Sequence, residues 1–80
     1  MSTSIDNHRL LARVTRVSGV RSGKPIILGT RVTVWDILGC LAGGMSETEI
    51  LDDFLYLKKE DIQAAIAYAA HVGKAALSEA

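Results

Sequence analysis

Side chains suited to contacting nucleic acid lie in two parts of this 80-residue chain. Lys58 and Lys59 stand where a helix is predicted to begin, and Gln63 follows on the same helix. Lysines in that place can hold phosphates, and a glutamine further along can reach a base edge. A second basic group lies nearer the N-terminus and comprises Arg21, Lys24 and Arg31. The sequence therefore offers two candidate surfaces for double-stranded DNA. The alternative is that these charged side chains serve only to keep the protein soluble.

Charge is divided unevenly along the chain. Residues 1–34 carry six basic side chains against Asp6 alone, a net charge of +5. Residues 35–80 carry three lysines against eight carboxylates, a net charge of −5. Four of those carboxylates fall on one predicted helix, namely Glu47, Glu49, Asp52 and Asp53. Phosphates would repel that helix, so we interpret it as a face for a basic protein partner or as solvated surface.

Catalytic and metal-binding motifs are incomplete. Residues 19–24 read G-V-R-S-G-K, with three residues between the glycines where a P-loop needs four, and Pro25 follows the lysine. The single cysteine, Cys40, excludes a disulfide within one chain, and we interpret it as a packed residue. His8 and His71 lie too far apart in the sequence to suggest a metal site. We expect a protein that is not an enzyme and that uses no cofactor or metal.

Length and composition indicate one small domain. A chain of this size buries only about 60% of its unfolded surface, yet 49% of its residues are hydrophobic. Small apolar domains often complete their core by self-association, so we expect a homodimer. No apolar run approaches the roughly 18–20 residues of a membrane span, and residues 1–7 are polar. We therefore expect a cytoplasmic protein without membrane contact.

The first third of the chain predicts short strands. Residues 1–8 read as a flexible tail, and residues 10–17 (LLARVTRV) alternate imperfectly between apolar and polar types, which favours a strand. Residues 18–25 contain glycines, serines and a proline and are typical of a loop. A second short strand is predicted at residues 26–28, followed by an extended segment at residues 31–33. Strands this short need a partner, which is either the other strand or a second chain.

Three helices are predicted after these strands. The first has Thr33 as a cap with Asp36 three residues later, and it ends at two consecutive glycines, residues 43 and 44. Ser46 and Glu49 form a capping box that begins the second helix. An apolar corner at residues 55–57 precedes the third helix, which runs from about Lys59 to residue 72 or beyond. Its predicted buried stripe comprises Ile62, Ala65, Ile66 and Ala69.

These elements predict an α+β fold that is mainly α. A short N-terminal β element precedes a three-helix, helix-turn-helix-like bundle. We place a single domain at residues 9–72 and a C-terminal tail at residues 73–80.

Three segments of the sequence resemble a known family, the domain of unknown function 433. They are G-K-P-I-I-L-G-T-R-V-T-V-W-D-I-L from residue 23, A-G-G-M-S-E-T-E-I-L-D-D-F from residue 42, and L-K-K-E-D-I-Q-A-A-I-A-Y-A from residue 57. The resemblance spans about residues 14–70. It implies a homeodomain-like helix-turn-helix protein similar to the antitoxins of VapB-type pairs, which neutralise a PIN-like toxin and bind their own operator DNA.

The sequence departs from that family pattern at several positions. Leu28 stands where the family often has Arg, Thr33 and Leu55 where it often has Pro, and Lys58 where it has a Thr that caps the third helix. Loss of that cap should cost about 1 kcal/mol. The resemblance thus implies an antitoxin-like regulator that binds a toxin and DNA, and a protein–protein adaptor without DNA binding is the alternative.

Overall fold

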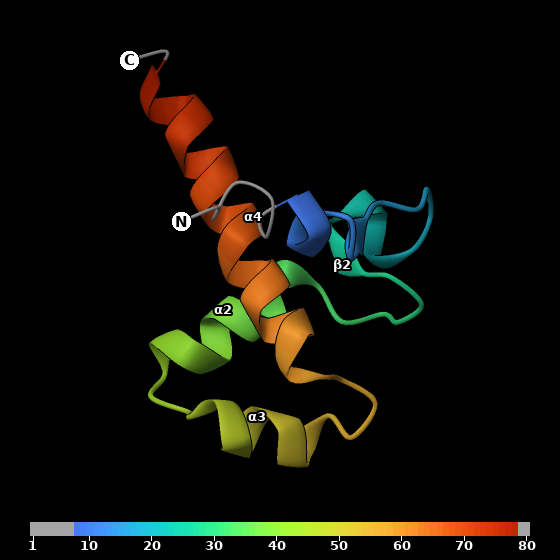
Figure 1. Cartoon of the computed structure of the whole chain (residues 1–80). Helices are drawn as coiled ribbons and strands as arrows, with labels where there is room; N and C mark the ends of the chain where they lie inside the picture. The colour runs from blue at the N-terminus through green and yellow to red at the C-terminus, as the bar shows by residue number, and fades with distance from the viewer. Residues whose placement is uncertain (1–7, 79–80) are drawn as a thin grey trace.

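Helices account for most of the described part of the chain (Figure 1). This computed structural model describes residues 8–78, with side chains to residue 73. The elements in chain order are β1 (Val14–Thr15), the 3-10 turn η1 (Arg21–Gly23), β2 (Ile26–Ile27), α2 (Val34–Ala42), α3 (Glu47–Asp53) and α4 (Lys59–Ser78). Helix α4 packs against α2, α3 and β1. The predicted class, α+β and mainly α, is confirmed.

The segment before β1 differs from its prediction. Residues 8–11 are helical, and only Val14 and Thr15 form a strand. Arg, Leu and Ala in this stretch favour a helix, whereas the β-branched Val14 and Thr15 favour a strand. The strand predicted over residues 10–17 was therefore wrong in its first part. His8, expected in the tail, begins the described chain in a helical turn, and residues 1–7 of that predicted tail lie outside the described residues.

The two strands pair with each other in an antiparallel sheet. Val14 lies opposite Ile27 and Thr15 opposite Ile26. Ile26 also forms a bridge with Thr33 on its other side, so the predicted extended segment is held against β2. Both isoleucines of β2 are buried, at 3% and 2% exposure, which shows how this short strand anchors the sheet to the core.

Both predicted ends of α2 and the predicted start of α3 are confirmed. Thr33 and Asp36 form a complete capping box at the start of α2, and Ser46 and Glu49 form one at the start of α3. Helix α2 ends in a Schellman motif, in which Met45 N–H donates to the Cys40 carbonyl and Gly44 N–H donates to the Leu41 carbonyl. Gly44 has φ +98°, a conformation that costs a glycine little.

Helix α4 has a carboxylate at its start and extends to Ser78, in agreement with the predicted end at residue 72 or beyond. The Lys58 N–H donates to Asp61 Oδ2 at 2.9 Å, so Asp61 serves the helix start, where the sequence has no Thr. The helix continues past Gly73 to Ser78, where we had expected a tail over residues 73–80. Its last turns extend away from the other elements (Figure 1). No helix of the described chain is both long and apolar enough to span a membrane.

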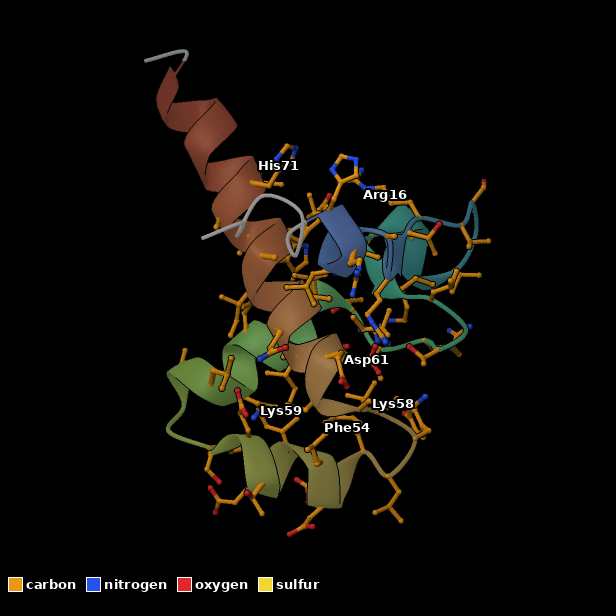
Figure 2. The ribbon with its side chains drawn as sticks, in the orientation of Figure 1. Arg16, Phe54, Lys58, Lys59, Asp61 and His71 are labelled. Atoms are coloured by element: carbon orange, nitrogen blue, oxygen red, sulfur yellow. The ribbon has the colours of Figure 1, made fainter. Side chains whose placement is uncertain are left out.

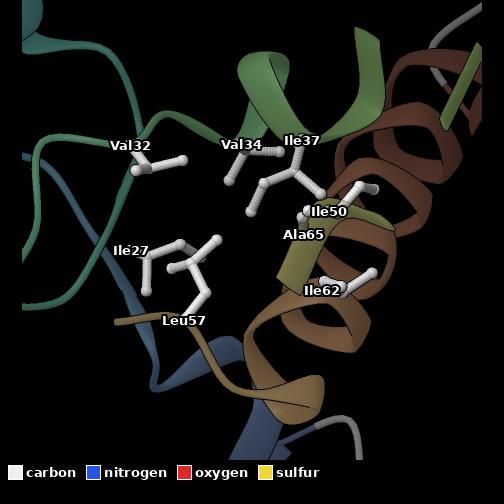
Figure 3. Close-up of a cluster of buried hydrophobic side chains, with 8 residues drawn as sticks. All are labelled: Ile27, Val32, Val34, Ile37, Ile50, Leu57, Ile62 and Ala65. Carbon is white, nitrogen blue, oxygen red and sulfur yellow. The ribbon is translucent and has the colours of Figure 1, made fainter. Parts of the chain in front are cut away.

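The core lies where α2, α3 and α4 meet the sheet. It consists of Ile27, Val32, Val34, Ile37, Ile50, Leu57, Ile62 and Ala65 (Figure 3). Two members of the predicted α4 stripe, Ile62 and Ala65, are fully buried, but Ile66 is 45% exposed and Ala64 is buried in its place. The stripe is rotated because α4 packs against β1 as well as against α2 and α3. Of the apolar corner at residues 55–57, only Leu57 is buried.

Candidate functional site

The outward face of α4 presents a line of side chains suited to contacting a ligand. Lys59, Gln63, Ile66 and Ala70 are all exposed. Their spacing of four, three and four residues places them on one side of the helix. Asp61, Ala64 and Ala65 are buried on the opposite side, and Ile62 is buried next to the line. Packing on α2 therefore fixes which side of α4 faces outward, and Lys59 and Gln63 share that side.

A groove runs along this face between α4 and the N-terminal segment. Its floor on α4 and its wall on the N-terminal segment are formed by Arg9, Leu10, Arg13, Glu60, Gln63, Ile66, Ala67 and Ala70. We call it the α4 groove. Arg9 and Gln63 are exposed within it. The tertiary structure thus places a guanidinium beside the amide side chain that sequence analysis selected for base contact.

One ion pair fixes the wall of the α4 groove. Arg13 Nη1 lies 3.0 Å from Asp61 Oδ1, and the Asp61 side chain is only 9% exposed. Asp61 also accepts the Lys58 N–H, so both of its carboxylate oxygens have a partner. A buried carboxylate that is paired and hydrogen-bonded in this way holds its neighbours firmly in place. Arg13 therefore ties the N-terminal segment to the first turn of α4.

The two lysines at the start of α4 do not share a surface. Figure 2 shows Lys58 leaving the chain on the side of Asp61, while Lys59 leaves on the opposite side. Both side chains are exposed. Only Lys59 therefore joins Gln63 on the outward face, and Lys58 extends from the corner between α3 and α4.

The second basic group is divided as well. Arg21 Nη1 donates to Asp36 Oδ2 and to the Arg31 carbonyl, both at 2.9 Å. Lys24 and Arg31 are exposed, and within the described residues neither forms an ion pair. Arg21 therefore fastens the N-terminal segment to α2, whereas Lys24 and Arg31 present their charges to solvent.

Asp36 is the acceptor in the ion pair with Arg21. Partial burial raises the pKa of Asp36, but hydrogen bonds from the Thr33 N–H and the Arg21 guanidinium, together with the charge of Arg21, outweigh that effect. The pKa of Asp36 consequently lies below its ordinary value. The carboxylate remains charged near neutral pH and keeps both the helix cap and the arginine in place.

The predicted acidic face lies along α3. Glu49 accepts the Ser46 N–H at 2.8 Å, so its carboxylate closes the capping box. Asp52 and Asp53 are exposed near the end of the helix, and Glu47 is half-buried. Among the residues with described side chains, none of these four carboxylates pairs with a basic group. Their negative charges are thus open to a partner at one end of the bundle.

Arg9 is the site residue that sequence analysis missed. Arg9, Arg13 and Arg16 have a spacing of four and three residues, which is typical of one helix face, but we interpreted this stretch as a strand. Arg16 Nη2 donates to the Tyr68 hydroxyl at 3.2 Å, so it also lies against α4. The helix-forming residues before Val14 were the signal that could have identified the helical turn that carries Arg9.

Cys40 and the metal-ligating side chain types form no further candidate site among residues 8–73. Cys40 is half-buried and packs against the core, as predicted. Across residues 8–73, no group of three or more His, Cys, Asp or Glu side chains is placed to hold a metal ion. The α4 groove and the α3 carboxylates therefore remain the main candidate sites.

Comparisons with known proteins agree on the family. The family model described as "Protein of unknown function (DUF433)" matches residues 14–69. A DUF433 member protein from Anabaena variabilis ATCC 29413, known from a crystal structure, has a similar fold with a TM-score of 0.73 and 24% sequence identity. The alignment covers 96% of this chain and 77% of that one. No curated protein matches. Because the family model covers most of the sequence, the chain belongs to the DUF433 family of proteins of unknown function.

Proposed function

We propose that this domain is an antitoxin-like regulator that binds its own operator DNA through the α4 groove and a PIN-like toxin through α3. The observation that carries the DNA part is the joint exposure of Lys59 and Gln63 on one face of α4, with Arg9 across the groove. In a helix-turn-helix unit the last helix enters the major groove, with its first turns nearest the bases. Helix α4 is the last helix of this bundle.

Lys59, at the start of α4, and the polar side chains of the groove have distinct roles in this proposal. Lys59 and Arg9 neutralise phosphates on the two sides of the helix, and such contacts supply most of the affinity. The Gln63 amide can pair with the edge of an adenine, which gives sequence preference. Glu60 also lines the groove and repels phosphates, so it lowers the affinity for DNA of any sequence.

The toxin part of the proposal is supported by charge. Asp52 and Asp53 are exposed at the end of α3. An acidic face of this kind attracts a basic partner surface and speeds encounter. The family resemblance suggests the identity of that partner, and a cytoplasmic location suits both ligands. The protein then carries a DNA surface and a protein surface on different elements.

The DNA part is tested with two lysine variants of equal charge change. Lys59→Glu should weaken binding to the DNA upstream of its own gene by roughly tenfold at low salt and reduce the salt slope by about one or more. Lys24→Glu, on the N-terminal loop, should leave binding within about twofold, since it contacts no phosphate in this proposal. Both are measured by gel shift at several salt concentrations. A loss with Lys24→Glu alone would contradict the α4 assignment.

The toxin part is tested with the same purified proteins. Asp52→Lys combined with Asp53→Lys should abolish capture of the neighbouring gene product and leave the gel shift intact. The double variant Lys58→Glu and Lys59→Glu should do the reverse. If wild-type protein captures that product but never shifts DNA, the domain is a protein–protein adaptor without DNA binding. If it captures nothing, the toxin part is wrong.

A further inference from the structure

Ile66 is an exposed apolar side chain of the α4 groove to which the proposed function gives no role. It is 45% exposed, whereas Ile62, one turn earlier on α4, is fully buried. Packing of α4 on the core therefore does not account for an isoleucine at this position. Ile66 lines the groove together with Gln63, which lies three residues before it on the outward face. A branched apolar group thus stands beside the amide that is proposed to contact a base.

The residues around Ile66 allow it to come close to the bases. Ala67 and Ala70 line the groove with it, and their methyl side chains let the backbone of α4 approach the floor of a major groove about 8.5 Å deep. The basic groups lie to either side, with Lys59 at the start of the helix and Arg9 across the groove. Charge at the margins with uncharged groups between them suits a duplex, in which phosphates flank the base edges.

The major-groove edge of DNA offers one apolar group, the C5 methyl of thymine. Adenine offers the donor and the acceptor that a glutamine amide pairs with, so A·T pairs supply a ligand for each of the two side chains. Gln63 and Ile66 are separated by three residues, a rise of about 4.5 Å along the helix. Successive base pairs are about 3.4 Å apart. The bases that the two side chains contact therefore lie on the same pair or on adjacent pairs.

We propose that the α4 groove selects A·T pairs in duplex DNA, with Ile66 against a thymine methyl group and Gln63 on an adenine of the same or the next pair. This inference rests on the proposed function and makes Ile66 a determinant of sequence preference. At a G·C pair Ile66 would instead meet the cytosine amino group, which it cannot pair with. A donor that loses its water without gaining an acceptor lowers affinity, so such sites bind more weakly.

DNA with uracil in place of thymine tests the contact, because this exchange removes the methyl group and leaves base pairing unchanged. The probe is the DNA upstream of its own gene, prepared once with thymine and once with uracil. Wild-type protein should bind the uracil probe about fourfold more weakly in a gel shift at fixed salt, the loss expected for one buried methyl group. Ile66→Ala should bind the thymine probe at least about fourfold more weakly than wild-type protein does. It should no longer distinguish the two probes.

Val72→Ala is the matched control for Ile66→Ala. Val72 is 41% exposed on the same helix, but it lies on the side that carries Asp61 and Ala65. Its replacement should leave binding to both probes unchanged. Gln63→Ala should weaken binding to both probes and keep the ratio between them, because it removes the adenine contact alone. A difference in duplex shape between the probes would affect wild-type protein and Ile66→Ala alike, so the comparison of these two isolates the methyl contact. Circular dichroism checks that each variant remains folded.

Equal binding of wild-type protein to the two probes would overturn the inference, and so would the same preference for thymine in Ile66→Ala. In either case, weakened binding by Lys59→Glu would show that the proposed DNA function holds without this contact. A wild-type protein that shifts neither probe would overturn the DNA function and this inference together. If Ile66→Ala loses capture of the neighbouring gene product but binds both probes as wild-type protein does, Ile66 contacts a protein and the inference is wrong.

Discussion

The starts of α2 and α4 differ from the start of α3. In α2 and α4 the third helical residue is an aspartate that accepts a backbone N–H and also pairs with an arginine of the N-terminal segment. In α3 the equivalent Glu49 accepts the Ser46 N–H, and its capping box is exposed. The starts of α2 and α4 are thus held by arginines of the N-terminal segment, whereas the start of α3 is capped only by residues near it in the sequence.

This difference distinguishes charges that hold the fold together from charges that a ligand can contact. Arg13 and Arg21 neutralise Asp61 and Asp36, so part of the basic front of the chain is used to hold the fold together. The acidic residues of α3 receive no such arginine among the described residues, which leaves them open to a partner. Charge counted along a sequence therefore overstates the charge that a ligand can meet.

The largest effect on the free energy of unfolding is expected at the buried side of the Arg13–Asp61 ion pair. Asp61→Ala should lower the free energy of unfolding by about 2 kcal/mol, because it leaves Arg13 unpaired and the Lys58 N–H without its acceptor. Chemical denaturation measures the change. Glu60→Ala, at an exposed neighbouring position, should stay within about 0.5 kcal/mol. Equal effects of the two variants would show that Asp61 is not the anchor of α4.

An intermediate effect on the free energy of unfolding is expected at the two ion pairs, Arg13–Asp61 and Arg21–Asp36. Arg13→Gln should cost about 1–2 kcal/mol, since the Asp61 carboxylate then stays buried without its charged partner. Arg21→Gln should cost about 0.5 kcal/mol, since its ion pair is more exposed and screened by solvent. Thermal and denaturant unfolding of both variants, at matched salt, gives the order. The reverse order would mean that the Arg21–Asp36 ion pair contributes more to stability than the Arg13–Asp61 ion pair.

The smallest effect is expected in the pH dependence of stability under acidic conditions. Because the pKa of Asp36 is lowered in the folded protein, its contribution to stability is present above the ordinary aspartate value of about 4 and is lost as the pH falls through the lower folded value. Asp36→Asn should therefore flatten the decline in stability between about pH 5 and pH 2. Denaturation midpoints across that range measure it. An unchanged slope would show that other carboxylates account for the acid sensitivity.

Local features of the fold were predictable from the sequence. The capping boxes at Thr33 and Ser46 and the glycine end of α2 depend on residues within a few positions of one another, and all three were found as predicted. The strand predicted over residues 10–17 failed in part, because an imperfect alternation was given more weight than the helix-forming residues before Val14. Ile66 was misplaced because the burial of α4 depends on the N-terminal sheet, which the helix pattern alone does not include.

The candidate sites were predictable only in fragments. Lys59 and Gln63 are four residues apart on one helix, so their shared face follows from helical periodicity. The position of Arg9 beside Gln63 was missed because it depends on two segments that meet only in the folded chain. Lys58 was grouped with Lys59, although neighbouring helix residues point in different directions.

The sequence by itself determined where α2 and α3 begin and where α2 ends, because caps and turns are short-range hydrogen bonds between near neighbours. It also determined the uneven distribution of charge. Only the tertiary structure decided which of those charges are neutralised. The Arg13–Asp61 hydrogen bond joins residues 48 positions apart, and Arg21 reaches Asp36 across 15. Contacts of that separation form only when the core has packed, since burial of apolar side chains offsets the entropy of closing such long loops.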